Sequence, residues 1–173
     1  MELRDEWLAL RGWHDDDVPA LVVACNDPEI ARWIPVIPSP YTEEDARAFI
    51  RGEVSSVPEH SFAITFQGIV VGAIGMSVVA PGTGRIGYWC AREWRSKGLT
   101  PRALRLVCRL GFEDLDLGRL ELFTEPENQA SQRVAEKVGF QKEGVLRSHM
   151  LHPDGTRRDS VMFSLLPGEL RDG

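Results

Sequence analysis

The pattern of hydrophobic and polar positions predicts strands in the middle of the chain. Between residues 62 and 66, large apolar side chains recur at every second position, which is the period of a strand with one buried face. Gln67-Gly68 has the composition of a tight turn, and residues 69–79 then run back. We therefore expect an antiparallel hairpin, followed by a further strand over residues 84–90.

A helical spacing replaces this alternation after Thr100. Thr100 is predicted to cap the helix because its hydroxyl can accept a hydrogen bond from a free amide, and Pro101 suits the first helical position. The apolar stripe of this helix consists of Leu104, Val107, Cys108, Gly111 and Leu115. This stripe is expected to pack on a sheet.

Caps and helix breakers place the other elements. Residues 34–41 contain three prolines and are expected to be extended, and Thr42 with Asp45 then predicts a helix to about Ser56. The remaining predictions are a strand over residues 5–10, short helices over 15–25 and 27–33, a strand that ends near Thr124, a helix from Asn128 to Gly139, and a strand through His149. The β-α-β-α-β order of the second half predicts that the strands flanking each helix are roughly parallel.

Length and composition favour one globular domain over residues 1–173. The chain is 43% hydrophobic and shows no repeat or long linker. Cys25, Cys90 and Cys108 are odd in number and lack metal-ligand spacing, so we expect free thiols in the cytoplasm and no bound metal. The charged start MELRDEWLAL does not resemble a signal peptide, and no apolar run is long enough to span a membrane. A net charge of -6 disfavours binding to nucleic acid.

A candidate anion site lies just before the helix that follows Thr100. Residues 95–99 offer consecutive backbone N–H groups, the side chains of Arg95 and Lys97, and a glycine, Gly98, that permits close approach of a ligand. The positive end of the helix dipole adds to this attraction for anions. The segment is typical of a pyrophosphate cradle. The alternative is an ordinary helix cap with basic residues placed there by chance.

Two motifs in this order resemble the GNAT superfamily of acetyl-CoA-dependent N-acetyltransferases. Residues 95–100 resemble the family's acetyl-CoA signature, which is Arg or Gln, two residues, Gly, one residue, and Gly or Ala. Residues 128–140, which end in Gly139-Phe140, resemble its later Asn…Gly-Phe signature. The segments IGYW, NDPEIARWIP and ENQASQRVAEKVGF are most similar to the Rim-type branch, which includes the ribosomal-protein N-terminal acetyltransferases.

The resemblance implies a fold and a place for acetyl-CoA, which would be a cosubstrate. The fold would be α/β (α+β), with a single mixed sheet of about six to seven strands and helices on both faces, splayed between the strands that end at Cys90 and near Thr124. Acetyl-CoA would lie in this gap. Pyrophosphate binding is implied for the backbone of Arg95, Ser96, Lys97, Gly98, Leu99 and Thr100, and pantetheine binding for Trp89, Cys90, Ala91, Asn128 and Ser131. Asn128 and Ser131 would equally suit a plain helix cap and its first turn.

Acyl transfer requires donors for the oxyanion and the leaving thiolate, and an acceptor for the proton of the amine. Ser131 is the predicted donor to the CoA sulfur, and Tyr88 is the other catalytic candidate. Many relatives carry a tyrosine where this chain has Ala135, and a glutamate where it has Arg85. The open candidates for the proton acceptor are Tyr88, Glu59, His60, His149 and His152. We expect Cys90 to be a small core thiol rather than a nucleophile.

The acceptor is expected to enter from residues 26–49. Trp33, the loop to Tyr41 and the acidic group at residues 43–45 would form a slot for a cationic amine, although the same acidic residues also suit a helix N-terminus. Two functions stay open. One is transfer of an acetyl group to a protein N-terminal amine or a small-molecule amine by direct attack in a ternary complex. The other is a CoA-binding regulatory or structural module without turnover. The oligomeric state is also open, a homodimer included.

Overall fold

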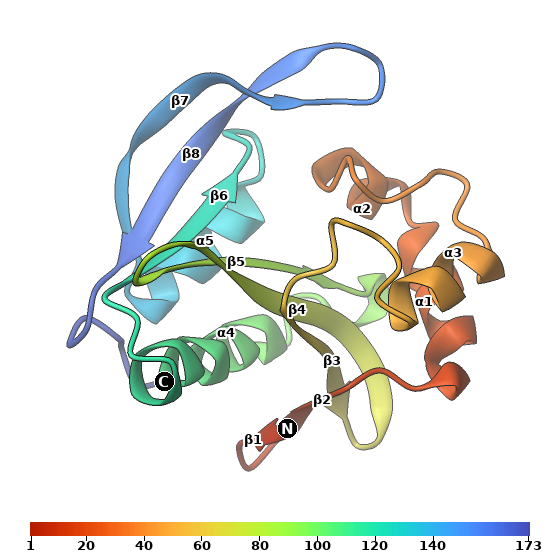
Figure 1. Cartoon of the computed structure of the whole chain (residues 1–173), viewed down its shortest axis with the longest axis horizontal. Helices are drawn as coiled ribbons and strands as arrows, with labels where there is room; N and C mark the ends of the chain where they lie inside the picture. The colour runs from red at the N-terminus through yellow and green to blue at the C-terminus, as the bar shows by residue number, and fades with distance from the viewer.

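The computed structural model describes all 173 residues and contains one eight-stranded sheet with helices on both faces (Figure 1). The strands are β1 (Leu3–Arg4), β2 (Leu8–Arg11), β3 (His60–Phe66), β4 (Ile69–Ala80), β5 (Thr83–Cys90), β6 (Arg119–Thr124), β7 (Gln141–Leu151) and β8 (Arg157–Leu165). The helices are α1 (Val18–Cys25), α2 (Pro28–Trp33), α3 (Glu43–Ile50), α4 (Leu99–Arg109) and α5 (Gln129–Val138). Short helical turns lie at η1 (Asp15–Asp17), η2 (Arg92–Trp94) and η3 (Leu110–Asp114).

The strand order is β1-β2-β3-β4-β5-β6-β8-β7. An antiparallel meander, β1 to β5, joins the C-terminal strands through one parallel contact between β5 and β6. β6 and β7 also run in the same direction, as predicted, but they are not neighbours. β8 lies between them and pairs antiparallel with both. The predicted α/β class with a mixed sheet is confirmed.

Two hydrophobic clusters hold the helices on opposite faces of the sheet. The larger cluster packs α4 and α5 against the strands, and it includes the predicted stripe residues Leu104 and Val107, both fully buried. The smaller cluster joins α1 and α3 and reaches Trp89 on β5. Each fully buried leucine or valine contributes roughly 1.5 to 3 kcal/mol relative to exposure, so these stripes are what fix the helices to the sheet.

The sheet separates between β5 and β6. The two strands pair only from Thr83–Ile86 to Arg119–Leu122, although both continue beyond these residues. On the β6 side, Tyr88, Trp89 and Cys90 therefore have no strand partner, while they remain paired with β4 on the other side. Past Leu122, β6 stays paired with β8. The sheet thus opens between the strand that ends at Cys90 and the strand that ends at Thr124, as predicted.

Three predicted boundaries were wrong. The strand expected over residues 5–10 begins only at Leu8, because Asp5 Oδ1 accepts hydrogen bonds from the amides of Trp7 and Leu8 and forms a turn between β1 and β2. This pair raises the strand count to eight. The helix expected to reach Ser56 ends at Ile50, where Gly52 adopts a positive φ of 70°.

The third correction concerns the start of α4. The helix begins at Leu99, and the capping position belongs to Gly98, with φ 77°, instead of Thr100. Pro101 accordingly occupies the third helical position rather than the first. The reason is conformational, because a glycine in the left-handed region can turn the chain directly into the helix without a side-chain cap.

Candidate active site

A cavity of about 780 Å³ opens at the separation of β5 from β6. Its volume is in the range of small-molecule sites, and it receives residues from both halves of the chain. The predicted site residues that line it are Tyr88, Trp89, Cys90, Arg95, Ser96, Thr100, Asn128 and Ser131. Ala91, Lys97, Gly98 and Leu99 lie next to these residues in the chain but are not part of the lining.

The loop before α4 presents free backbone donors. None of the amides from Ser96 to Thr100 donates to a backbone acceptor, because Ser96 (φ 61°) and Gly98 (φ 77°) turn the chain away from regular pairing. Helix N-termini normally leave such amides unsatisfied, and the dipole of the 11-residue α4 adds positive potential there. This arrangement can bind a diphosphate through backbone N–H groups.

The side chain of Arg95 points to α2 instead of standing free beside this loop. Its guanidinium pairs with Asp27 Oδ2 at 2.6 Å and Glu29 Oε2 at 3.0 Å, and its Nε donates to the carbonyl of Cys90 at 3.1 Å. Asp27 also caps α2 by accepting from the amide of Glu29. Arg95 thus ties α2 to the end of β5, and its charge is already balanced.

A pair of hydroxyl groups faces the separation from both sides. Tyr88 Oη on β5 lies 3.0 Å from Ser131 Oγ on α5 and 3.3 Å from the carbonyl oxygen of Ser131. Burial raises the pKa of the Tyr88 phenol above its usual range, and this effect outweighs the hydrogen bond to Ser131. Tyr88 is therefore a neutral donor near pH 7 and a poor base.

Asn128 has the geometry of a helix cap. Its Oδ1 accepts from the amide of Ser131 at 3.2 Å, and α5 ends at Gly139, whose φ is 116°. The cap places Ser131 in the first turn of α5, where its hydroxyl meets Tyr88. The capping role and the place in the cavity thus coexist at Asn128.

Only two of the five candidates for the proton acceptor line the cavity. Tyr88 and His149 line it, whereas Glu59, His60 and His152 do not. The ring of His149 packs on Phe123 with 4.9 Å between centroids, and its Nδ1 lies 3.0 Å from Ser160 Oγ. A hydrogen bond at Nδ1 fixes the ring and leaves Nε2 as the other site for a proton.

Glu125 is a cavity residue that the sequence reasoning missed. It follows β6 directly, is 6% exposed, and lies 2.6 Å from His152 Nε2 through Oε1. Despite this short distance, Glu125 Oε1 and His152 Nε2 do not form a hydrogen bond. The other carboxylate oxygen, Oε2, accepts a hydrogen bond from Arg158 at 3.2 Å. A charged residue immediately after a buried strand was the available signal. The contacts connect the end of β6 to the β7–β8 hairpin.

Cys90 has the environment of a structural thiol. Burial raises the pKa of Cys90, and the nearby Thr100 and Arg95 lower it only in part. A neutral thiol is a weak nucleophile. We expect Cys90→Ala to retain acetyl transfer within a few-fold in a steady-state assay, and a loss of all turnover with intact folding would instead indicate a covalent intermediate at Cys90.

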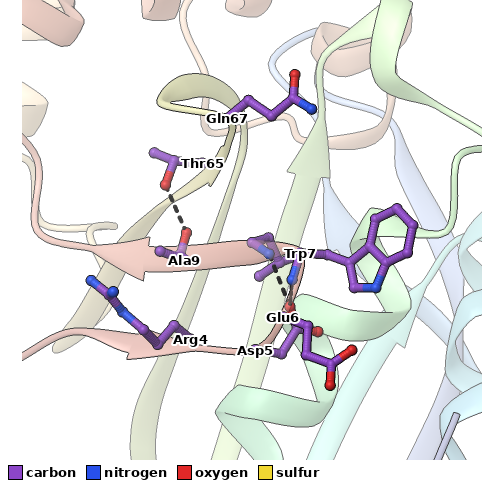
Figure 2. Close-up of a pocket in the computed structure, with 8 residues that line it drawn as sticks. Arg4, Asp5, Glu6, Trp7, Ala9, Thr65 and Gln67 are labelled. Atoms are coloured by element: carbon purple, nitrogen blue, oxygen red, sulfur yellow. Dashed lines mark hydrogen bonds between the residues drawn. The ribbon is translucent and has the colours of Figure 1, made fainter.

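A second, shallower hollow of about 230 Å³ lies at the β1–β2 turn (Figure 2). It is lined by residues such as Arg4, Trp7 and Thr65, and it contains none of the predicted site residues. Thr65 Oγ1 donates to the carbonyl of Ala9, and Asp5 holds the turn, so its polar groups serve the local fold.

The separation of β5 from β6 and the free amides before α4 agree with the expected class, an acetyl-CoA-dependent N-acetyltransferase. Comparison with known proteins agrees, since residues 8–141 match the model of the acetyltransferase (GNAT) domain. The chain belongs to this GNAT family. No group of His, Cys, Asp or Glu side chains forms a cluster suited to a metal ion, and none of the helices has the length and hydropathy needed to cross a bilayer.

Individual relatives extend over most of the chain. An uncharacterized N-acetyltransferase, p20, of Bacillus licheniformis is 31% identical over 96% of this chain and 97% of its own. A putative ribosomal N-acetyltransferase, YdaF, of Bacillus subtilis is 27% identical, over 87% and 85%. The structure of Mycobacterium smegmatis RimJ in complex with CoA-disulfide has a TM-score of 0.83 at 24% identity and covers 96% of this chain and 85% of its own. At 24% identity, the similarity to RimJ shows a shared fold and nothing about activity.

Proposed function

We propose that the protein transfers the acetyl group of acetyl-CoA directly to a primary amine, either a protein N-terminal amine or a small-molecule amine, in a ternary complex in the cytoplasm. The observation that carries this proposal is the convergence of unsatisfied amides and a hydroxyl pair on one cavity. The amides of residues 96–100 would hold the pyrophosphate, and the free edge at Trp89 and Cys90 would bind the pantetheine amides as a further strand would. The sequence also predicted Arg95 and Ala91 for these roles, but the amide of Arg95 donates to Arg92, and Ala91 is bonded to Val71 and Trp94.

Ser131 and Tyr88 would act on the departing sulfur. Ala135 is fully buried on α5 and supplies no general acid, but the neutral phenol of Tyr88 donates into the same region. In this proposal, Tyr88 orients the Ser131 hydroxyl toward the thiolate as the thioester breaks. His149 would receive the proton of the amine, directly or through water, because it is the histidine that lines the cavity.

The stabilising effect of acetyl-CoA tests this binding. Since only the folded state presents the amides, ligand at 100 times its dissociation constant should add about 2.7 kcal/mol, which corresponds to a rise in melting temperature of roughly 5 to 10 °C. A thermal scan with acetyl-CoA and, as the control, adenosine measures it. An unchanged melting temperature at millimolar acetyl-CoA would contradict the proposed cradle.

A CoA-binding module without turnover is the second candidate. It is favoured by Ala135 and by Arg85, whose guanidinium lies over Phe123 at 4.7 Å and 3.5 Å from Glu121 instead of serving as a base. Release of free CoA thiol in the presence of a panel of amines and peptides distinguishes the two functions. Amine-dependent release supports the enzyme, and binding of acetyl-CoA without release supports the module.

A further inference from the structure

We propose that the amine acceptor carries an apolar, preferably aromatic, group next to its amine, and that polyamines are poor acceptors. This inference rests on the proposed function and names its substrate class. It comes from the wall of the cavity on the side of the N-terminal half, where α2, the proline-rich loop and α3 face β5 across the opening.

This wall is almost entirely apolar. Its side chains include Trp33, Ile34, Val36, Ile37, Phe49 and Val54. Val36 is 58% exposed, so this wall presents apolar surface to water. Covering such a surface with an apolar ligand is favourable in proportion to the area removed from water.

Two of the three carboxylates that border the cavity are paired with cations. Glu29 pairs with Arg95, and Glu125 contacts Arg158 and His152. Asp45 accepts from both the amide and the hydroxyl of Thr42 through Oδ2, which closes the cap of α3, but no cation pairs with this carboxylate. The two neighbouring acidic residues, at positions 43 and 44, pair with arginines and do not line the cavity. Of the acidic group expected to form a slot, only Asp45 therefore reaches the cavity, and a single carboxylate cannot pair with the several charges of a polyamine.

Two arginines near the cavity oppose a second positive charge on the acceptor, Arg32 beside the wall and Arg85 across from it on β5. The guanidinium of Arg32 lies 4.3 Å from the ring centre of Trp33, so one face of this indole already carries a cation. Arg85 borders the cavity from β5 and is 3.5 Å from its nearest acidic partner, Glu121. A polyamine would thus meet arginines and mostly paired carboxylates, whereas an apolar group would meet uncharged side chains.

The wall fits the acceptor better than the donor. The amides for the pyrophosphate lie at the N-terminus of α4, and the Tyr88–Ser131 pair lies in the separation of the strands. The apolar wall belongs to other elements, the segments 33–38 and 49–54. An amine that enters along this wall would reach the thioester from the side opposite α5.

Binding measured without turnover tests the acceptor class. The protein is saturated with CoA, which cannot acetylate, and titrated in a calorimeter with 2-phenylethylamine, ethylamine and spermidine. We expect 2-phenylethylamine to bind at least about tenfold more tightly than either of the others, because it alone buries a ring against the wall. Equal or tighter binding of spermidine would overturn the proposal.

Variants connect this preference to the wall. Trp33→Ala should reduce the affinity for 2-phenylethylamine about tenfold and leave that for ethylamine unchanged. Trp7→Ala is the matched control, because Trp7 is exposed at the β1–β2 turn, outside the cavity (Figure 2). Val36→Ser, at an exposed position, gives a second test if Trp33→Ala does not fold. Unchanged affinity in folded Trp33→Ala and Val36→Ser would place the acceptor elsewhere.

Two further outcomes separate this inference from the proposed function. Selective binding of 2-phenylethylamine without acetyl transfer from acetyl-CoA would support the acceptor site and refute the enzyme. A preference for hexanoyl-CoA over acetyl-CoA that disappears in Trp33→Ala would assign the wall to the acyl donor and overturn the inference while leaving acyl transfer intact.

Discussion

Gly98→Val is expected to abolish acetyl-CoA binding. Gly98 holds φ at 77°, a region that β-branched residues rarely adopt, and it stands between the free amides that form the proposed cradle. A Cβ at this position meets no protein atom within 4 Å, so the expected effect comes from lost backbone geometry and from the space that a phosphate would occupy. Losing two charged hydrogen bonds should weaken binding about 100-fold or more, measured by calorimetry with CoA.

Two variants serve as controls for Gly98→Val. Gly68 turns the β3–β4 hairpin at φ 79°, and a Cβ there would also meet no protein atom within 4 Å, so Gly68→Val introduces the same backbone strain away from the cavity. Arg102 pairs with Asp5 at 3.1 Å and points to the β1–β2 turn, and Arg102→Ala should leave CoA affinity nearly unchanged. Equal losses in all three variants would show that the cradle lies in another part of the chain.

Ser131→Ala is expected to lower turnover while acetyl-CoA affinity stays within a few-fold. If the hydroxyl stabilises the thiolate only as the thioester breaks, it acts on rate and not on ground-state binding. By analogy with an oxyanion-hole donor, its loss should cost about 2 to 4 kcal/mol of transition-state stabilisation, or less where water replaces it. Saturated turnover and calorimetric affinity, measured on the same protein, separate the two effects.

Tyr88→Phe is the companion variant to Ser131→Ala. Both remove one member of the 3.0 Å hydroxyl pair, and the double variant should lose less than the sum of the two single losses because the groups are in contact. If turnover survives and affinity falls in Ser131→Ala, Ser131 is a residue that seats pantetheine and not a catalytic residue.

Local interactions let the sequence predict several of the turns and helix ends. The cap at Asn128, the terminating Gly139 and the hairpin turn at residues 67–68 each depend on neighbours a few positions away. The cap of α4 was misplaced, because Thr100 has the better side chain and Gly98 has the better backbone. Where two local signals compete, surrounding packing selects between them.

The two motifs, the alternation of strands and helices, and the residues that could bind a diphosphate could all be read from the order of amino acids. Tertiary structure alone decided what these residues contact. Tyr88 meets Ser131 across 43 positions, and Arg95 meets Asp27 across 68, which removes its charge from the cradle. Pairing at such separations depends on strand order and on where β5 leaves β6, and neither has a local signature in the chain. For the same reason, the apolar wall and the paired carboxylates that border it became visible only once α2 and α3 were placed against the open sheet.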